Sequence, residues 1–164
     1  MATATYVPLA TQTLGSAASS ITFSSIPSGY KDLRLVLTCK QSSGTVPYLQ
    51  FNGDTGSNYS STYLSDNGSS PASSNITSYS SILLSQNVTI TSSTIPTSFF
   101  VDLMSYSGST NKTVLGSTAG DLNGSGYIIS LVGLWQSTSA ITSIFIGGNG
   151  SNFSVGTTAT LWGI

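Results

Sequence analysis

Hydrophobic and polar residues alternate along much of the chain with a period of two, the pattern of strands that bury one face against a core. The clearest run is Leu33–Lys40, where Leu33, Leu35, Leu37 and Cys39 point one way and their neighbours the other. Shorter runs cover residues 20–24, 99–104 and 160–164. Strong helix formers are scarce, because the chain has no Glu, three Lys, one Arg and two Met. The pattern therefore predicts an all-β protein with essentially no helix.

Turn-forming residues separate these runs. Asn-Gly pairs, which favour tight hairpin turns, begin at residues 52, 67, 123 and 149. The low-complexity segment Asp66–Asn75 predicts a loop. Strands at this spacing are typical of a single antiparallel β-sandwich of jelly-roll type. We expect the strands near residues 4–13, 19–25, 31–40, 47–52, 58–64, 79–85, 87–92, 98–106, 112–118, 126–135, 141–147 and 157–163.

The chain divides into an N-terminal strand or arm, residues 1–18, and a sandwich domain, residues 19–164. Sandwiches commonly protect their edge strands with charged residues, Lys above all, but only three Lys are present. A nearly uncharged surface also gives little electrostatic resistance to association. We therefore expect the protein to work within an assembly that covers its edges.

Composition excludes several kinds of chemistry. Charged residues make up 5% of the chain and the net charge is -1, so we expect neither nucleic acid nor a membrane as partner. The chain has no His, which excludes a Ser-His-Asp triad and a Cys-His dyad. A glycan-cleaving enzyme would need a pair among the five Asp residues, each of which has a simpler role in a turn or beside a cation. We expect no enzymatic activity and no cofactor.

Several Asx residues carry candidate metal or glycan chemistry. Asn52, Asp54, Asp66 and Asn67 have oxygen atoms of the kind that Ca²⁺ binds, but no known calcium-loop spacing is present. Asx side chains often bond to the backbone of their own turn, so we expect turn capping and no metal. Eight of the nine Asn residues begin Asn-x-Ser/Thr triplets. Glycosylation or cooperation of Asx and hydroxyl groups in turns would account for this excess.

Aromatic residues supply the candidate contact site. Tyr59 and Tyr63 flank a polar loop, and they are the aromatic residues that we most readily place on the surface. For the other aromatic residues we expect core positions. Exposed tyrosines commonly contact sugar rings or protein partners. With Asn58 and Asp54 beside them, Tyr59 and Tyr63 form a candidate site for a partner or a glycan.

The segment Phe51–Tyr59, FNGDTGSNY, resembles a group of small structural proteins of tailed bacteriophages. The likeness extends to Tyr6–Leu14, to Ser20–Leu33 and to the ending between Ala140 and Ile164. It implies a non-enzymatic virion component whose β-sandwich forms a homo-oligomer, with a trimer favoured. The segment itself predicts a hairpin, in which Phe51 is the last inward residue, Asn52 and Gly53 make the turn and Asp54 caps it.

Two functions follow from the resemblance. The first is a capsid decoration (cement) protein on the outer surface of the head, which binds across neighbouring subunits of the major capsid protein and stabilises them. The second is a tail or fibre module that contacts other virion proteins and recognises cell-surface carbohydrate. It would use Tyr59, Tyr63 or neighbouring loop aromatics, with Asn and Ser side chains supplying hydrogen bonds. Catalytic and metal-binding residues are not part of either expectation.

Overall fold

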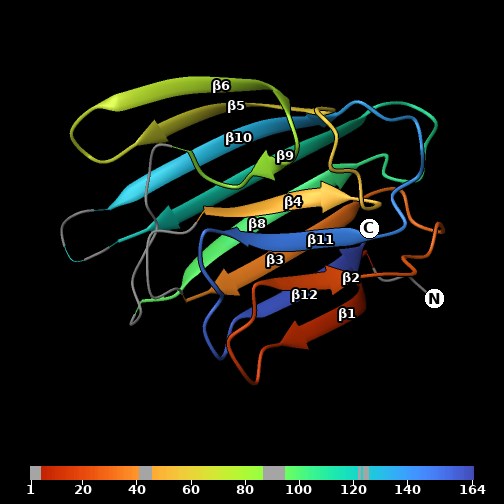
Figure 1. The fold of residues 1–164 in the computed structure, drawn as a ribbon, viewed down its shortest axis with the longest axis horizontal. Coiled ribbons are helices and arrows are strands. Elements are labelled where there is room, and N and C mark those ends of the chain that lie inside the picture. The colour runs from red at the N-terminus through yellow and green to blue at the C-terminus, as the bar shows by residue number, and fades with distance from the viewer. Residues whose placement is uncertain (1–4, 41–45, 87–94, 122, 124–125) are drawn as a thin grey trace.

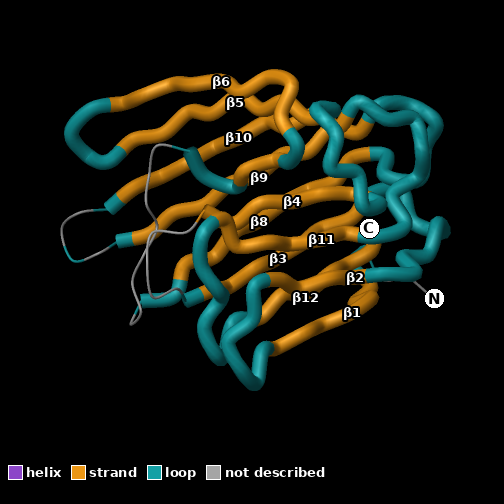
Figure 2. Tube along the Cα trace, viewed as in Figure 1, coloured by secondary structure: helices purple, strands orange, loops and turns teal. Residues whose placement is uncertain are grey.

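A computed structural model describes residues 5–40, 46–86, 95–121, 123 and 126–164 (Figure 1). This part of the chain is built from strands, turns and loops without a helix (Figure 2). The strands are β1 (Val7–Thr13), β2 (Ser20–Phe23), β3 (Leu33–Cys39), β4 (Val46–Phe51), β5 (Tyr59–Asp66), β6 (Pro71–Tyr79), β7 (Ile82–Leu83), β8 (Thr97–Met104), β9 (Lys112–Gly120), β10 (Tyr127–Trp135), β11 (Ile144–Asn149) and β12 (Thr158–Gly163).

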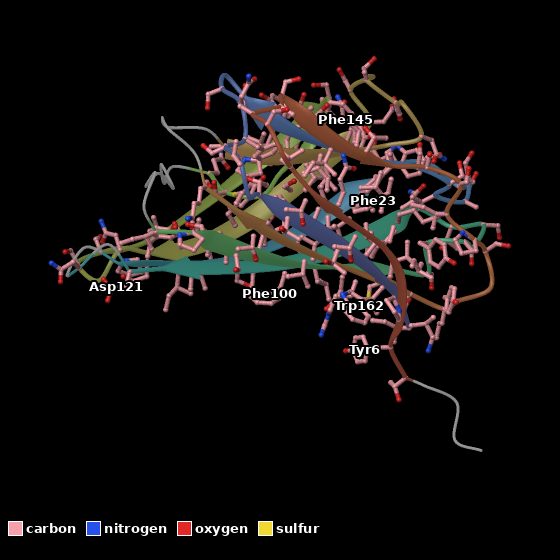
Figure 3. All side chains as sticks on the ribbon, turned by 90° about the horizontal axis from the view of Figure 1, so that it is seen from below. Tyr6, Phe23, Phe100, Asp121, Phe145 and Trp162 are labelled. Carbon is pink, nitrogen blue, oxygen red and sulfur yellow. The ribbon has the colours of Figure 1, made fainter. Side chains whose placement is uncertain are left out.

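The strands form two antiparallel sheets. The larger sheet has the order β1-β12-β3-β8-β9-β10-β5-β6, and the smaller sheet has the order β2-β11-β4-β7. Seen from the side, the smaller sheet lies as a second layer over one face of the larger sheet (Figure 3). The expected all-β sandwich is therefore confirmed.

The core lies between the two layers, and the period-two pattern determines which residues enter it. Leu33, Leu35 and Leu37 have no exposed surface, and Cys39 is also buried. Inward residues of the smaller sheet, such as Ile21 and Ile144, meet them from the opposite side. Burial of this apolar surface, at about 25 cal/mol per Å², is the main favourable term that holds the two sheets together.

Two sequence predictions between residues 66 and 86 were wrong. Asp66–Asn75 was expected to be a loop, but most of it belongs to the end of β5 and to β6, which pairs antiparallel with β5. The segment 79–85 was expected to be one strand, but Tyr79 ends β6 and, among the segment's residues after it, Ile82–Leu83 alone pair, with β4. Small polar residues fill both faces of β6, so its sequence carries no hydrophobic alternation. The expected strand at 87–92 lies outside the described residues.

The N-terminal segment is part of the larger sheet. β1 pairs with β12 from Val7 opposite Gly163 to Thr13 opposite Thr158. Leu9 and Ala10 pack against the core, and Leu14 donates a backbone hydrogen bond of 2.9 Å to the carbonyl of Thr157. Residues 7–14 are therefore held along their whole length.

We expect the protein to lose stability as the pH rises above about 9, because buried acidic groups keep their protons in the folded state. Burial raises the pKa of Cys39 and of Tyr59 to about 12, and it also raises the pKa of Tyr63, Tyr106 and Tyr127. In the unfolded chain these groups lose their protons near their ordinary pKa values, 9.0 for Cys and 10.0 for Tyr. The unfolded state is therefore increasingly favoured as the pH rises.

Urea unfolding between pH 7 and pH 11 measures this loss. Burial lowers the pKa of Lys112, which acts in the opposite direction, but only one such lysine is set against five acidic groups. The variant Cys39→Ala should lack the part of the loss that begins near pH 9 and keep the part that begins near pH 10. A free energy of unfolding that stays constant from pH 8 to pH 11 would contradict the expectation.

Candidate functional site

The segment FNGDTGSNY connects the two layers of the sandwich. Phe51 is the last residue of β4 in the smaller sheet and is fully buried, and Tyr59 is the first residue of β5 in the larger sheet. Asn52 and Gly53 adopt φ angles of 54° and 71°, so the expected Asn-Gly turn is present. The expected hairpin is wrong, because β4 pairs with β11 and β7 whereas β5 pairs with β6 and β10. The segment is a crossover between the sheets.

Asp54 holds this crossover in place. Its carboxylate accepts hydrogen bonds from the Trp135 indole nitrogen at 2.7 Å, from the Gly56 backbone nitrogen at 2.9 Å and from Asn58 Nδ2 at 3.0 Å. These bonds, the Trp135 bond first among them, lower the pKa of Asp54. An ionised carboxylate therefore caps the turn and ties it to the end of β10, with Asn58 as its partner.

The expectation that Tyr59 and Tyr63 lie on the surface was wrong. Both rings are buried, with exposed fractions of 1% and 2%. The Tyr59 hydroxyl donates to the Asp54 carbonyl and accepts from the Phe51 backbone nitrogen, both at 3.0 Å. The Tyr63 hydroxyl donates to the Leu83 carbonyl at 3.0 Å. The polar loop suggested exposure, but backbone partners satisfy both hydroxyls and allow the rings to enter the core.

The structure therefore brings three of the four expected contact residues together, and their contacts stabilise the fold. Asp54, Asn58 and Tyr59 form one hydrogen-bonded cluster at the crossover, and Tyr59 stacks against Trp135 with ring centroids 6.3 Å apart. Tyr63 bonds separately to β7. Both tyrosines are therefore buried and hydrogen-bonded within the fold, and neither ring is exposed to a partner or a glycan.

The Asx oxygens considered for Ca²⁺ are used by the backbone. Asn52 Oδ1 accepts hydrogen bonds from the backbone nitrogens of Thr142 and Ser143 at 2.8 and 3.1 Å. Asp66 and Asn67 cap the residues 68–70 that follow them. Turn capping is thus confirmed at Asp54, Asp66 and Asn67, whereas Asn52 bonds to the distant segment before β11. Among the described residues, no three His, Cys, Asp or Glu side chains form a group that could hold a metal ion.

A surface that the sequence analysis did not single out lies on the far side of the larger sheet. Phe100, Trp162 and Tyr6 project from this face, away from the smaller sheet (Figure 3). Large apolar side chains from β5, β8, β9 and β10 have substantial exposed fractions, and we call them the outer apolar face: Leu64 62%, Phe100 49%, Met104 37%, Leu115 44%, Ile128 65% and Val132 44%. Strand pairing brings Leu115 beside Val132. Large apolar side chains gathered on one exposed sheet face make that face a candidate interaction site.

One ion pair lies on the same face. Arg34 donates to both carboxylate oxygens of Asp102, at 2.6 and 2.7 Å, and to the Tyr6 hydroxyl at 3.0 Å. The bond to Asp102 raises the pKa of Arg34. A shallow hollow beside the pair is lined by Phe100, Leu115, Ser117 and Ser130 together with the ion pair itself. The ion pair therefore lies at the β3–β8 side of the outer apolar face, where its two charges balance each other.

The fold and this face define a two-layer antiparallel β-sandwich with one exposed apolar sheet face. Comparison of the chain with protein-family models, with curated proteins and with solved structures finds no match in any of the three. The described residues also contain no helix long and apolar enough to cross a membrane. The function is therefore inferred from the geometry and from the residues that carry the resemblance.

Proposed function

We propose that the protein is a non-enzymatic structural component of a tailed-bacteriophage virion, most directly a decoration (cement) protein that binds the assembled head. The observation that carries the proposal is the outer apolar face, exposed on a sandwich that has almost no charge. The likeness of Phe51–Tyr59 to phage structural proteins is the reason for proposing a virion as the assembly to which the protein belongs. The major capsid protein is the proposed partner.

The chemistry of the face suits a permanent contact. Stable obligate interfaces are more apolar than transient ones and commonly exceed about 2,000 Å². Aromatic and Arg side chains contribute most to binding in protein interfaces, and Phe100 and Arg34 both line the hollow. Burying this surface against two neighbouring capsid subunits would stabilise the assembled lattice, because a protein that binds only the assembled state shifts the equilibrium toward it.

The carbohydrate-binding alternative is weakened, because the tyrosines proposed to contact the sugar are not on the surface. The two aromatic residues named for it, Tyr59 and Tyr63, are both buried. A tail position would now have to use the outer apolar face as well. The copy number of the protein in the particle separates the two positions.

Quantitative mass spectrometry of purified virions, with the major capsid protein as the internal reference, tests the proposal. Hundreds of copies per particle would support a place on the head lattice. A few copies to a few tens would move the protein to the tail and overturn the cement role. Absence from purified particles would overturn the virion role altogether.

Substitutions on the outer apolar face should weaken binding to heads that lack the protein. We expect Phe100→Ala to raise the Kd about 30-fold, as for a binding hot spot of about 2 kcal/mol, and Leu115→Asp to raise it at least as much. The matched control is Thr22→Asp, an exposed position on the smaller sheet, which should bind as the wild type does. Unchanged binding of both face variants, with circular dichroism showing native strands, would contradict the docking role of this face.

A further inference from the structure

Within the described residues the two sheets have four edge strands, and three of them are protected against pairing with another chain. β2 and β7 are short, with four and two residues. β1 contains Pro8 and a register irregularity between Pro8 and Ala10. Short length, proline and bulges are the devices by which natural sheets avoid edge-to-edge association. β1, β2 and β7 are therefore poor templates for an added strand.

β6 lacks these devices over most of its length. It has nine residues, its proline is the first of them, and none is charged. Its irregular register with β5 lies at the far end, between Tyr59 and Ser61 of β5. Ser74 and Ile76 are half-buried and the other seven residues are exposed. β6 runs along the upper margin of the molecule (Figure 1), so residues 72–77 form an uninterrupted edge.

We propose that β6 pairs with the β6 of a second copy of this chain, antiparallel and about a two-fold axis. Antiparallel pairing of two identical strands is an isologous contact that closes after two subunits. A second copy is favoured because it presents the same uncharged edge of the same length. A pairing centred on Ser74 sets Ser73 opposite Asn75 and Ala72 opposite Ile76. No charged residues are opposite each other in this pairing, so the repulsion that destabilises cross-strand pairs of like charge is absent.

The charge nearest to this edge does not oppose the pairing. Asp66 is opposite Pro71 in the β5–β6 pair, at one end of the strand. In the two-fold pair the equivalent end of the second copy lies six residues further along, about 20 Å away at 3.4 Å per residue. This separation exceeds the Debye length of about 8 Å at physiological ionic strength. Repulsion between the two carboxylates is therefore screened.

The geometry of the pair has a consequence for docking. Directly opposed residues of an antiparallel pair point to the same side of the sheet, so the two-fold axis stands perpendicular to the sheet. Both outer apolar faces then point in the same direction. A dimer would present two docking faces to one surface, and linked contacts of this kind raise avidity. The pairing itself does not depend on the proposed virion role.

Sedimentation velocity of the purified full chain tests the pairing, over about a hundredfold range of concentration so that mass action is visible. We expect a dimer for the wild type. Asn75→Lys and, as a second variant, Ser73→Lys should each raise the dimer dissociation constant at least about tenfold, because they place like charges beside the axis. The matched control is Gln12→Lys on the opposite edge strand β1, where the residue is exposed, and it should leave the dimer unchanged.

The other outcomes overturn the inference. A wild-type monomer over the whole range, the trimer implied by the resemblance, or a dimer that persists in both lysine variants would each exclude pairing through β6. The virion copy number remains a separate test: a lysine-sensitive dimer that is absent from particles would leave the edge pairing intact and remove the proposed function. A monomer found in hundreds of copies per head would support the proposed function and exclude the edge pairing.

Discussion

Replacing Asp54 by alanine is expected to lower the free energy of unfolding by about 3 kcal/mol. Hydrogen bonds to a charged acceptor contribute about 1.5–3 kcal/mol, and a buried donor left without a partner costs about 1–3 kcal/mol. Asp54 accepts from the indole nitrogen of Trp135, a residue only 2% exposed, and from the Gly56 backbone. The substitution therefore loosens the crossover between the two sheets and leaves a buried indole N–H unpaired.

Urea unfolding of Asp54→Ala, Trp135→Phe and the double variant measures this coupling as a double-mutant cycle. We expect the two single effects not to add, since each removes the same bond. Asp66→Ala, which removes an exposed turn cap, is the control and should cost about 1 kcal/mol or less. If Asp54→Ala unfolds like the wild type, the crossover is held by other contacts.

The contribution of the Asp54 carboxylate to the free energy of unfolding should also be lost in acid. Its hydrogen bonds, that from Trp135 above all, hold the pKa of Asp54 below its ordinary value of 3.8. A lowered pKa in the folded state means that the stabilisation is fully present above pH 3.8 and is lost as the pH falls through the folded pKa. The variant Asp54→Asn should lack this part of the acid sensitivity. Equal acid unfolding of the two proteins would count against the ionised cap.

Replacing Lys112 by alanine should be the more damaging change, at about 4 kcal/mol, because it combines a cavity with unpaired carbonyls. Lys112 has no exposed surface. Its ammonium donates to the carbonyl of Gly108 at 2.8 Å and to that of Thr110, and the Ser137 carbonyl is 3.5 Å away. The Lys112 ammonium therefore connects the β8–β9 loop to the segment after β10, because carbonyl groups of both segments lie around it.

Thermal and urea unfolding of three lysine variants separate the contributions. Lys112→Met keeps the apolar stem and removes the donor, so we expect an intermediate loss of about 2 kcal/mol. Lys31→Ala removes an exposed lysine and should change stability by less than about 0.5 kcal/mol. A Lys112→Met variant as stable as the wild type would show that packing of the stem, and not the hydrogen bonds, fixes these loops.

The fold was predictable wherever one face of a strand is apolar and the other polar. Leu33–Cys39 is such a strand, and its inward residues are the ones that the alternation selected. β6 was missed because Ser and Asn occupy both of its faces at a sheet edge, where burial is slight. The turn at Asn52 was recognised, but not the sheet to which the next strand belongs. Local turn chemistry does not specify long-range pairing.

The contact surface could be predicted less well, because solvent exposure depends on which layer covers a strand. Tyr59 and Tyr63 adjoin polar residues and are nevertheless buried. The signal for the outer apolar face was present in β10, an apolar run in which Ile128 and Val132 alternate with buried residues. A strand apolar on both faces normally lies within a buried sheet. Here the smaller sheet covers one side only, and the sequence contains no indication of that asymmetry.

The place of β12 between β1 and β3 affects how the chain reaches this structure. Val7 pairs with Gly163, so nearly the whole described chain must be closed into a loop before β1 has a partner. Pairings so distant in sequence cost loop-closure entropy early and slow the folding of β proteins. Until β12 docks, β1 and the open side of β3 have no partner strand. The yield of folded protein should therefore depend on temperature and chain concentration during refolding more than on the stability of the final sandwich.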